Sequence, residues 1–182
     1  MDLKEIAVDN FNANIFSVLN QDWMLLTAGD FHGHKFNCMT VSWGFMGTFW
    51  SKPVVIAGVR PQRFTSEFMD DYESFTLSAF AEEYKQALSF CGANSGREVD
   101  KIRQAGLTAE ASDKVSAPGY AEAELIIECR KIYGDRLEPK NFIDKSIISE
   151  CYKNRDFHKL FFGEVVKIRG AAKYCRKTLS AD

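Results

Sequence analysis

Short apolar runs separated by turn residues dominate the chain. Many of them alternate apolar and polar positions, and the run at 53–59, PVVIAGV, is rich in β-branched residues. This pattern is typical of strands, and the segments 20–22 and 31–34 have the composition of turns. We predict strands at 15–19, 23–29, 36–43, 53–59, 74–80, 121–133 and 157–170, whereas 142–148 fits either a strand or a short helix.

Other segments have the apolar spacing of a helix. In the first of them, Thr65 or Ser66 stands near the expected N-cap. In the last, Ser95 and Glu98 form a capping-box pattern and Gly106 is a typical stop. We predict helices at 63–72, 82–94 and 95–106.

The order of these elements indicates the fold class. The early strands are joined by tight turns and not by helices of crossover length, which favours an antiparallel barrel over a doubly wound sheet. No linker rich in Pro, Gly or Ser divides the chain. We therefore expect a mainly β protein, a β-barrel with helical inserts, that forms a single domain over residues 1–182.

Composition narrows the function classes. Hydrophobic residues make up 46% of the chain and aromatic residues 13%, which is compatible with a barrel core or a site for a flat ligand. The formal net charge is −2, so no basic surface for nucleic acid is expected. The N-terminus lacks the apolar stretch of a signal peptide, and no segment has the ~18 apolar residues of a membrane span. We expect a cytoplasmic protein without a membrane partner.

Metal chemistry is not expected from the cysteines and histidines. The five cysteines are scattered without a CxxC motif, and the three histidines provide one close pair, His32 and His34. Metal sites need clustered ligands, and scattered cysteines in such a chain are usually buried apolar groups.

Several motifs together resemble those of a known family. In order along about residues 15–170, the chain carries the blocks NCMTVSWG, VRPQRFT, SGREVDK and HKLFFGEVV. It is similar to the flavin reductase-like family, with its FMN-binding split barrel of antiparallel Greek-key type, and looks closest to the flavoredoxin-like branch. The resemblance implies a homodimer that binds FMN and takes electrons from NADH or NADPH.

The strand at 36–43 carries polar residues on both faces. Asn37, Met39 and Trp43 alternate with Thr40 and Ser42. Buried polar groups need partners, and a flavin offers a phosphate, ribityl hydroxyls and a polar ring edge. We expect Asn37, Thr40 and Ser42 to contact these groups and Met39 and Trp43 to contact the ring. The alternative is that the hydroxyls pair with neighbouring strands and Trp43 belongs to the core.

The block RPQRFT follows an apolar strand and opens a helix. Free amides at a helix N-terminus favour anions, and arginine binds phosphate oxygens in pairs. Arg60, Arg63 and Thr65 are therefore candidates for the FMN phosphate. The alternative for Arg63 is an ion pair with Glu67, four residues further along the helix.

A second block repeats this chemistry. Ser95 and Gly96 precede the expected helix, which also carries Arg97 and Lys101. The resemblance implies that this loop completes the phosphate or ring site, either in the same subunit or across a dimer. The alternative is a plain capping box with exposed charges.

His158 is the candidate catalytic residue. Relatives in the reductase branch carry a Gly-Asp-His tripeptide near this point, and here the residues are Asp156-Phe157-His158. An imidazole there could orient the nicotinamide or relay a proton. The alternative is a packed or exposed histidine without a function.

The sequence supports three functions in this order. The first is an NAD(P)H-dependent FMN reductase-like oxidoreductase, in which the absence of GxGxxG is no objection because in this family the nicotinamide stacks on the flavin. The second is an electron carrier of flavoredoxin type with a redox partner protein. The third is a non-catalytic flavin-binding module. Activity like that of pyridoxamine phosphate oxidase or haem-utilisation proteins fits the motifs less well.

Overall fold

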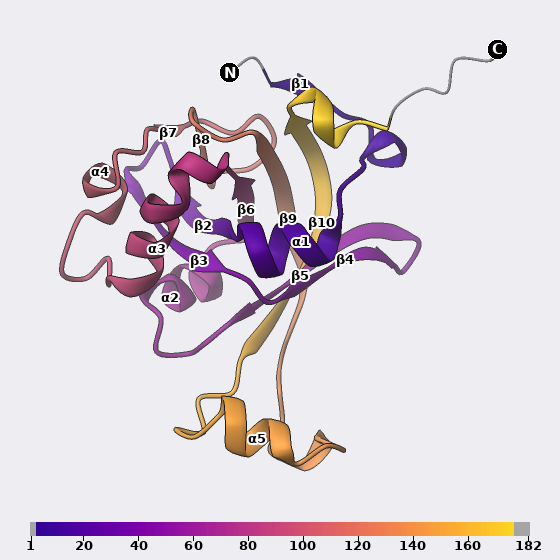
Figure 1. Cartoon of the computed structure of the whole chain (residues 1–182), viewed down its shortest axis with the longest axis vertical. Coiled ribbons are helices and arrows are strands. Elements are labelled where there is room, and N and C mark those ends of the chain that lie inside the picture. The colour runs from indigo at the N-terminus through magenta and orange to yellow at the C-terminus, as the bar shows by residue number, and fades with distance from the viewer. Residues whose placement is uncertain (1–2, 177–182) are drawn as a thin grey trace.

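The computed structural model describes residues 3–176 and is built around one antiparallel sheet (Figure 1). The expected mainly β barrel with helical inserts is confirmed. The sheet contains β1 (Lys4–Glu5), β2 (Met24–Asp30), β3 (Lys35–Val41), β4 (Gly44–Phe49), β5 (Lys52–Val59), β6 (Ser74–Ala79), β9 (Leu125–Arg136) and β10 (Lys159–Gly170). A separate small sheet pairs β7 (Ala109–Glu110) with β8 (Gly119–Tyr120).

The strand order explains how the sheet curls. Neighbouring strands follow the order β3-β2-β6-β9-β10-β5-β4, and β1 adds to β10. The two edge strands β3 and β4 are consecutive in the chain and are joined by Ser42 and Trp43. The two edges of the sheet are therefore brought together at these two residues, and both residues line a cavity described below.

The helices lie in the segments that connect the strands of the sheet or follow its last strand. They are α1 (Ile15–Ser17), α2 (Phe64–Asp71), α3 (Lys85–Ala93), α4 (Lys101–Gln104) and α5 (Ser146–Cys151), the π-helix η2 (Val18–Asp22), and the 3-10 helices η1 (Val8–Asn10), η3 (Glu82–Tyr84), η4 (Pro139–Asn141) and η5 (Ala172–Tyr174).

The buried residues of β2 show why the sheet needs cover on both faces. Met24, Leu26 and Ala28 pack inside the barrel, whereas Leu25 belongs to a second apolar cluster. Successive side chains of a strand point to opposite faces, so one strand contributes to both clusters. Leu88 and Cys91 of α3, together with Cys38 of β3, belong to the same second cluster.

The connection between β9 and β10 extends away from the barrel. Both strands continue past the other strands to η4 and α5, which lie at the bottom of the view in Figure 1. We call residues 137–158 the excursion. Phe142 packs against Tyr152 and Phe157 within it, so the excursion has its own aromatic contacts. It brings Cys151, Tyr152 and His158 back toward Trp43.

The strand expected at 15–19 is wrong. The segment is helical, because Ile15, Val18 and Leu19 share one helix face toward the interior while Phe16 points outward and is 88% exposed. Asn14 caps this helix by accepting a hydrogen bond from the Ser17 amide. An apolar run this short fits the period of a strand as well as that of a helix, so the contacts with the barrel decide its conformation.

The expected helix at 95–106 is also largely wrong, since only Lys101–Gln104 is helical. The Ser95 hydroxyl accepts from the Arg97 amide in a local turn, and Asp100 caps the short helix instead. Similarly, α2 is capped neither by Thr65 nor by Ser66, because its N-cap residue is Arg63.

Other boundaries differ less. The strand at 36–43 ends at Val41, β4 was not predicted, and 142–148 contributes the start of the helix α5. The register against β9 shifts between Phe162 and Gly163, which marks a β-bulge, and a Cβ on Gly163 would lie 2.6 Å from the Phe75 ring.

Candidate functional site

A polar cavity of about 340 Å³ lies where several segments meet. Met39 comes from β3, Arg60, Arg63 and Thr65 come from the end of β5 and the start of α2, and Ser95 comes from the turn after α3. These segments are remote in sequence, and the curl of the sheet and the packing of α3 bring them together. The lining residues are Met39, Arg60, Gln62, Arg63, Phe64, Thr65, Ala93, Asn94, Ser95, Lys101 and Asp156.

Two cations dominate the inner part of the polar cavity. Lys101 is buried, and its Nζ donates to the carbonyl oxygens of Cys91 at 3.1 Å and Asn94 at 3.3 Å. Arg63 donates through Nη1 to the Gly92 carbonyl at 2.6 Å. Burial lowers the pKa of Lys101, and the nearby positive charge of Arg63 lowers it further. An anion bound between the two would relieve this repulsion.

The start of α2 adds backbone donors to the same cavity. Phe64 and Thr65 are the first residues of this helix and line the cavity, while the Arg63 side chain makes no capping hydrogen bond. The first amides of a helix have no partner within it and carry the positive end of its dipole. The cavity therefore combines two cationic side chains with a helix end that favours anions.

Arg60 is held at the rim of the polar cavity. Its Nη1 lies 2.5 Å from Asp156 Oδ2, and its Nη2 donates to the Cys151 carbonyl at 2.9 Å. The guanidinium also lies over the rings of Trp43 and Tyr152, with its Cζ 5.8 and 5.2 Å from their centroids. Arg60 thus connects the barrel to the excursion, and most of its charge is already paired.

Asn37 and Gly96 form the wall behind this site. Asn37 Nδ2 donates to Thr65 Oγ1 at 2.7 Å, and that hydroxyl in turn donates to the Cys38 carbonyl at 2.9 Å. A Cβ on Gly96 would lie 2.1 Å from Asn37 Oδ1, so only glycine allows the turn at 95–97 to approach β3 this closely. The buried amide therefore positions Thr65 and the turn together.

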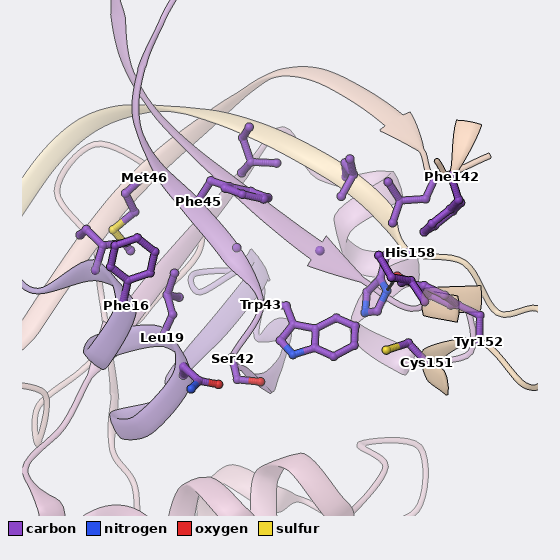
Figure 2. A pocket seen from close by; sticks show the side chains of 18 residues that line it. Phe16, Leu19, Ser42, Trp43, Phe45, Met46, Phe142, Cys151, Tyr152 and His158 are labelled. Atoms are coloured by element: carbon purple, nitrogen blue, oxygen red, sulfur yellow. Dashed lines mark hydrogen bonds between the residues drawn. The ribbon is translucent and has the colours of Figure 1, made fainter. Parts of the chain in front are cut away.

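An apolar cavity of about 710 Å³ lies on the other side of Arg60 (Figure 2). Ser42, Trp43 and Phe45 line it from the junction of β3 and β4, Phe16 and Leu19 from the α1–η2 segment, and Tyr152 and His158 from the excursion. Figure 2 shows the Trp43 ring beside His158, and their ring centroids are 5.2 Å apart. Trp43 is 47% exposed and is therefore not a core residue.

His158 is a buried, oriented imidazole. Its Nδ1 lies 2.8 Å from the Tyr152 hydroxyl, and a Cβ on Gly58 would lie 3.4 Å from Cδ2 of the ring. Burial lowers the pKa of His158 to about 4, and the Arg60 charge acts in the same direction. The imidazole is therefore neutral at pH 7.

Comparison with known proteins identifies the family. The model for the flavin reductase like domain matches residues 17–178. The chain belongs to the flavin reductase-like family. An uncharacterized protein of Pyrococcus abyssi is 29% identical over 130 residues, which cover 69% of this chain and 72% of the relative.

Solved structures with the same fold include flavoproteins of this type. The flavoredoxin of Desulfovibrio vulgaris is 21% identical, with a TM-score of 0.64, over 83% of this chain and 70% of its own. An FMN-binding domain of a flavin reductases-like enzyme from Shewanella baltica is 18% identical, with a TM-score of 0.65, over 93% of this chain and 77% of its own. At these identities the likeness establishes the split-barrel fold.

This flavin reductase-like chain gathers many of the residues singled out from its sequence. The polar cavity includes Met39, Arg60, Arg63, Thr65, Ser95 and Lys101. A neighbouring cavity of about 700 Å³ includes Asn37, Gly96 and Lys101, and the apolar cavity includes Ser42, Trp43 and His158.

Two of the singled-out residues lie elsewhere. The Thr40 hydroxyl donates to the Leu88 carbonyl at 2.5 Å, on the α3 side of β3. Arg97 pairs with Glu67 and lies over the Phe64 ring. Glu67 therefore has an arginine partner, but that partner is Arg97 and not Arg63. The ligand-binding roles expected for Thr40 and Arg97 stay predictions.

Sequence reasoning missed Asp156 and Tyr152 as site residues of this flavin reductase-like protein. Asp156 binds Arg60, and Tyr152 binds His158. The first pair joins the excursion to the barrel. The second pair lies within the excursion, at the end that leads into β10. The only local signal was the position of Asp156 two residues before His158, because nothing in the apolar pattern indicates where the excursion returns.

Among the helices of residues 3–176, none combines the length and the apolar character required to cross a bilayer.

Proposed function

We propose that this flavin reductase-like protein is an oxidoreductase that binds FMN and accepts electrons from NADH or NADPH. The observation that supports it most is the polar cavity, where Arg63, Lys101 and the start of α2 converge. These groups suit a phosphate, since they offer charged and backbone donors with no aspartate or glutamate at the inner end. Asp156, the one acidic lining residue, is paired with Arg60 at the rim.

In this proposal the chain holds FMN by its phosphate and presents its ring to the junction of β3 and β4. Arg63 and Lys101 would bind phosphate oxygens, and Thr65 and Ser95 would contact the phosphate or the ribityl hydroxyls. Met39 lines the cavity between these groups and the barrel interior, so it would contact the flavin from the sheet side. Trp43 and Ser42 stand at the junction itself.

Bound FMN would supply the hydride chemistry, which no side chain of the chain provides. The protein's contribution is placement and charge. The cations of the polar cavity fix one end of the cofactor, and the aromatic wall around Trp43 restricts water at the other end. Neutral His158 can donate or accept a hydrogen bond there without placing a charge beside the ring.

A homodimer is part of this proposal. Phe49, Trp50, Tyr133 and Phe162 contact one another on the outer surface, and the first three are 49%, 54% and 46% exposed. We call this group the aromatic edge cluster. An exposed apolar patch of this kind is typical of an interface, and a second copy would cover it.

A second function is an electron carrier of flavoredoxin type, which would hold FMN tightly and exchange electrons with a redox partner protein. The likeness in fold to a flavoredoxin supports it. Steady-state oxidation of NADH with free FMN separates the two, because a carrier turns over little NADH. A flavin-binding module without activity would neither oxidise NADH nor exchange electrons with a partner protein.

The proposal is tested by purifying the protein, recording its visible spectrum and titrating it anaerobically with NADH and NADPH. We expect FMN to bind with a shifted flavin spectrum and to be reduced by at least one nucleotide faster than free FMN. A colourless protein that neither binds added FMN nor accelerates its reduction contradicts the proposal.

A further inference from the structure

Cys38 of β3 and Cys91 of α3 are completely buried free thiols where this helix packs on the sheet. Cys38 and Thr40 are two positions apart, so their side chains point to the same side of the strand. Thr40 contacts α3 directly, because its hydroxyl donates to the Leu88 carbonyl and a Cβ on Gly92 would lie 3.2 Å from its own Cβ. Cys91 comes three positions after Leu88 and therefore lies on the same face of the helix. Cys38 and Cys91 thus face each other across the contact between β3 and α3.

The surroundings of Cys38 favour its thiolate, which is the form that reacts with oxidants. The neighbouring Cys91 thiol lowers the pKa of Cys38 by hydrogen bonding. The Lys101 charge and a hydrogen bond with Tyr120 lower this pKa further, whereas burial opposes them. The contact between the two thiols has the reverse effect on Cys91, because it raises the pKa of that residue. Cys38 is therefore suited to attack an oxidant, and Cys91 is suited to react with the product.

Lys101 connects the thiol pair to two cavities. Its Nζ donates to the Cys91 carbonyl at 3.1 Å, and the residue lines both the polar cavity and the neighbouring cavity of about 700 Å³. Asn37, which precedes Cys38 in β3, also lines the neighbouring cavity. A small, uncharged oxidant such as hydrogen peroxide therefore has a short path to the pair through a local opening at Lys101.

The backbone at Cys91 also holds the cations of the polar cavity. The Cys91 carbonyl accepts from Lys101, and the next carbonyl, that of Gly92, accepts from Arg63 Nη1 at 2.6 Å. A disulfide has an S–S length of about 2.05 Å, which is shorter than any contact between sulfurs that are not bonded. Bond formation would therefore draw Cys91 toward β3 and move both carbonyls, and Lys101 and Arg63 would lose their present positions.

We propose that Cys38 and Cys91 form an oxidative modification site, at which hydrogen peroxide converts the two thiols into a disulfide that weakens FMN binding in the polar cavity. Cys38 Sγ attacks one peroxide oxygen, the O–O bond breaks, and the leaving hydroxide takes up the proton that the Cys38 thiol released. Cys91 Sγ then attacks the sulfenic acid sulfur of Cys38, so that the S–S bond forms, the S–O bond breaks and a second water leaves with the Cys91 proton. The thiols lose two electrons and two protons, and the peroxide gains them. The disulfide is independent of the proposed function, whereas its effect on FMN rests on that function.

Treatment of the full chain with hydrogen peroxide tests the disulfide. The remaining thiols are blocked with N-ethylmaleimide in urea, and the protein is digested without reduction. We expect mass spectrometry to show the peptides of Cys38 and Cys91 joined, and dithiothreitol to separate them. Cys151 and Cys175 are partly exposed and report the peroxide dose. Oxidation of these two cysteines without a link between Cys38 and Cys91 overturns the proposal.

Single variants assign the two steps. In Cys91→Ala the sulfenic acid on Cys38 should accumulate and react with dimedone, whereas Cys38→Ala should give no dimedone adduct on Cys91. Cys129→Ala is the matched control, because Cys129 is also completely buried and burial raises its pKa, so the link between Cys38 and Cys91 should still form. A dimedone adduct on Cys91 in Cys38→Ala, or a link that involves Cys129, overturns the assignment. The wild-type link decides the proposal even if a variant fails to fold.

FMN titration of the reduced and the linked protein tests the effect on the polar cavity. We expect the linked protein to bind FMN about tenfold more weakly, as the loss of one hydrogen bond to a charged group provides, and dithiothreitol to restore the affinity. Cys38→Ala should bind FMN equally before and after peroxide. Equal affinities of reduced and linked wild type overturn the proposed effect. FMN binding by a protein that forms no link overturns only this inference, whereas a link in a protein that does not bind FMN contradicts only the proposed function.

Discussion

Arg60 and Asp156 form an ion pair across the rim of the polar cavity, with 2.5 Å between Nη1 and Oδ2. Arg60 directly follows the strand β5, whereas Asp156 belongs to the excursion, 96 residues further along the chain. The same carboxylate also accepts from Gln62 Nε2 at 2.6 Å. One acidic side chain therefore joins the excursion to the barrel and reduces the positive charge that an anion in the cavity would experience.

Asp156→Asn should raise the affinity for FMN about five- to tenfold at low salt, because it removes a negative charge from the cavity and frees Arg60. The gain should shrink as ionic strength rises, since exposed charges are screened. Fluorescence titration with FMN measures both effects. Asp135→Asn, which changes an exposed carboxylate bound to Tyr133, is the control and should leave the affinity unchanged. A lower affinity in Asp156→Asn would contradict the role assigned to this pair.

Gly96→Ala should reduce the free energy of unfolding by about 2 kcal/mol and weaken FMN binding, because the new methyl would overlap Asn37 Oδ1 and force the turn away from β3. Urea unfolding and FMN titration measure the two effects. In the control Gly47→Ala the added methyl meets no atom within 4 Å, so stability should change by less than about 0.5 kcal/mol. Equal stability of the two variants would mean that the turn does not depend on this close approach.

We expect the buried, neutral imidazole of His158 to lower the free energy of unfolding in acid. Its folded-state pKa of about 4 lies below the ordinary value of 6.5, so between these values the unfolded chain binds the proton more readily than the folded protein. Stability from the neutral imidazole is therefore complete above pH 6.5 and falls as the pH drops toward 4, by at most about 3 kcal/mol. Urea unfolding from pH 7 to 4 should show a shallower decline for His158→Gln than for wild type. His32→Gln, on an exposed turn, should follow the wild type, and parallel curves for all three proteins would exclude this effect.

Trp50→Glu should convert the expected dimer into a monomer, because a carboxylate would have to be desolvated within the aromatic edge cluster. Size-exclusion chromatography with light scattering should give about twice the chain mass of 20.6 kDa for wild type and the chain mass for the variant. Glu83→Lys on η3 also changes an exposed charge and should remain dimeric. A monomeric wild type would remove the support for a dimer.

The sequence predicted the parts of the fold and site that depend on local patterns. The block from Arg60 to Thr65 combines a strand end, two arginines and a helix start within six residues, so its place at an anion-favouring cavity follows from neighbours in the chain. The long strands could be predicted because apolar and polar positions alternate over many residues in them.

The rest depended on contacts between distant segments. The segment 15–22 has too few residues to separate a helix period from a strand period, and its inward face is defined by the barrel that it covers. Ser95 and Glu98 fit a capping box, but the close approach of Gly96 to Asn37 imposes a turn there. Tyr152 and Asp156 meet His158 and Arg60 only because β9 and β10 return the excursion to the barrel, which no local pattern encodes.

The most direct test of the polar cavity compares FMN with riboflavin, which lacks the phosphate, in wild type, Arg63→Ala and Arg130→Ala. If Arg63 and Lys101 hold the phosphate, wild type should bind FMN about a hundredfold more tightly than riboflavin, as two charge-assisted hydrogen bonds provide. Arg63→Ala should reduce that ratio about tenfold, whereas Arg130→Ala, which removes an exposed partner of Glu164 away from the polar cavity, should keep it. Equal affinities of wild type for FMN and riboflavin would contradict the account.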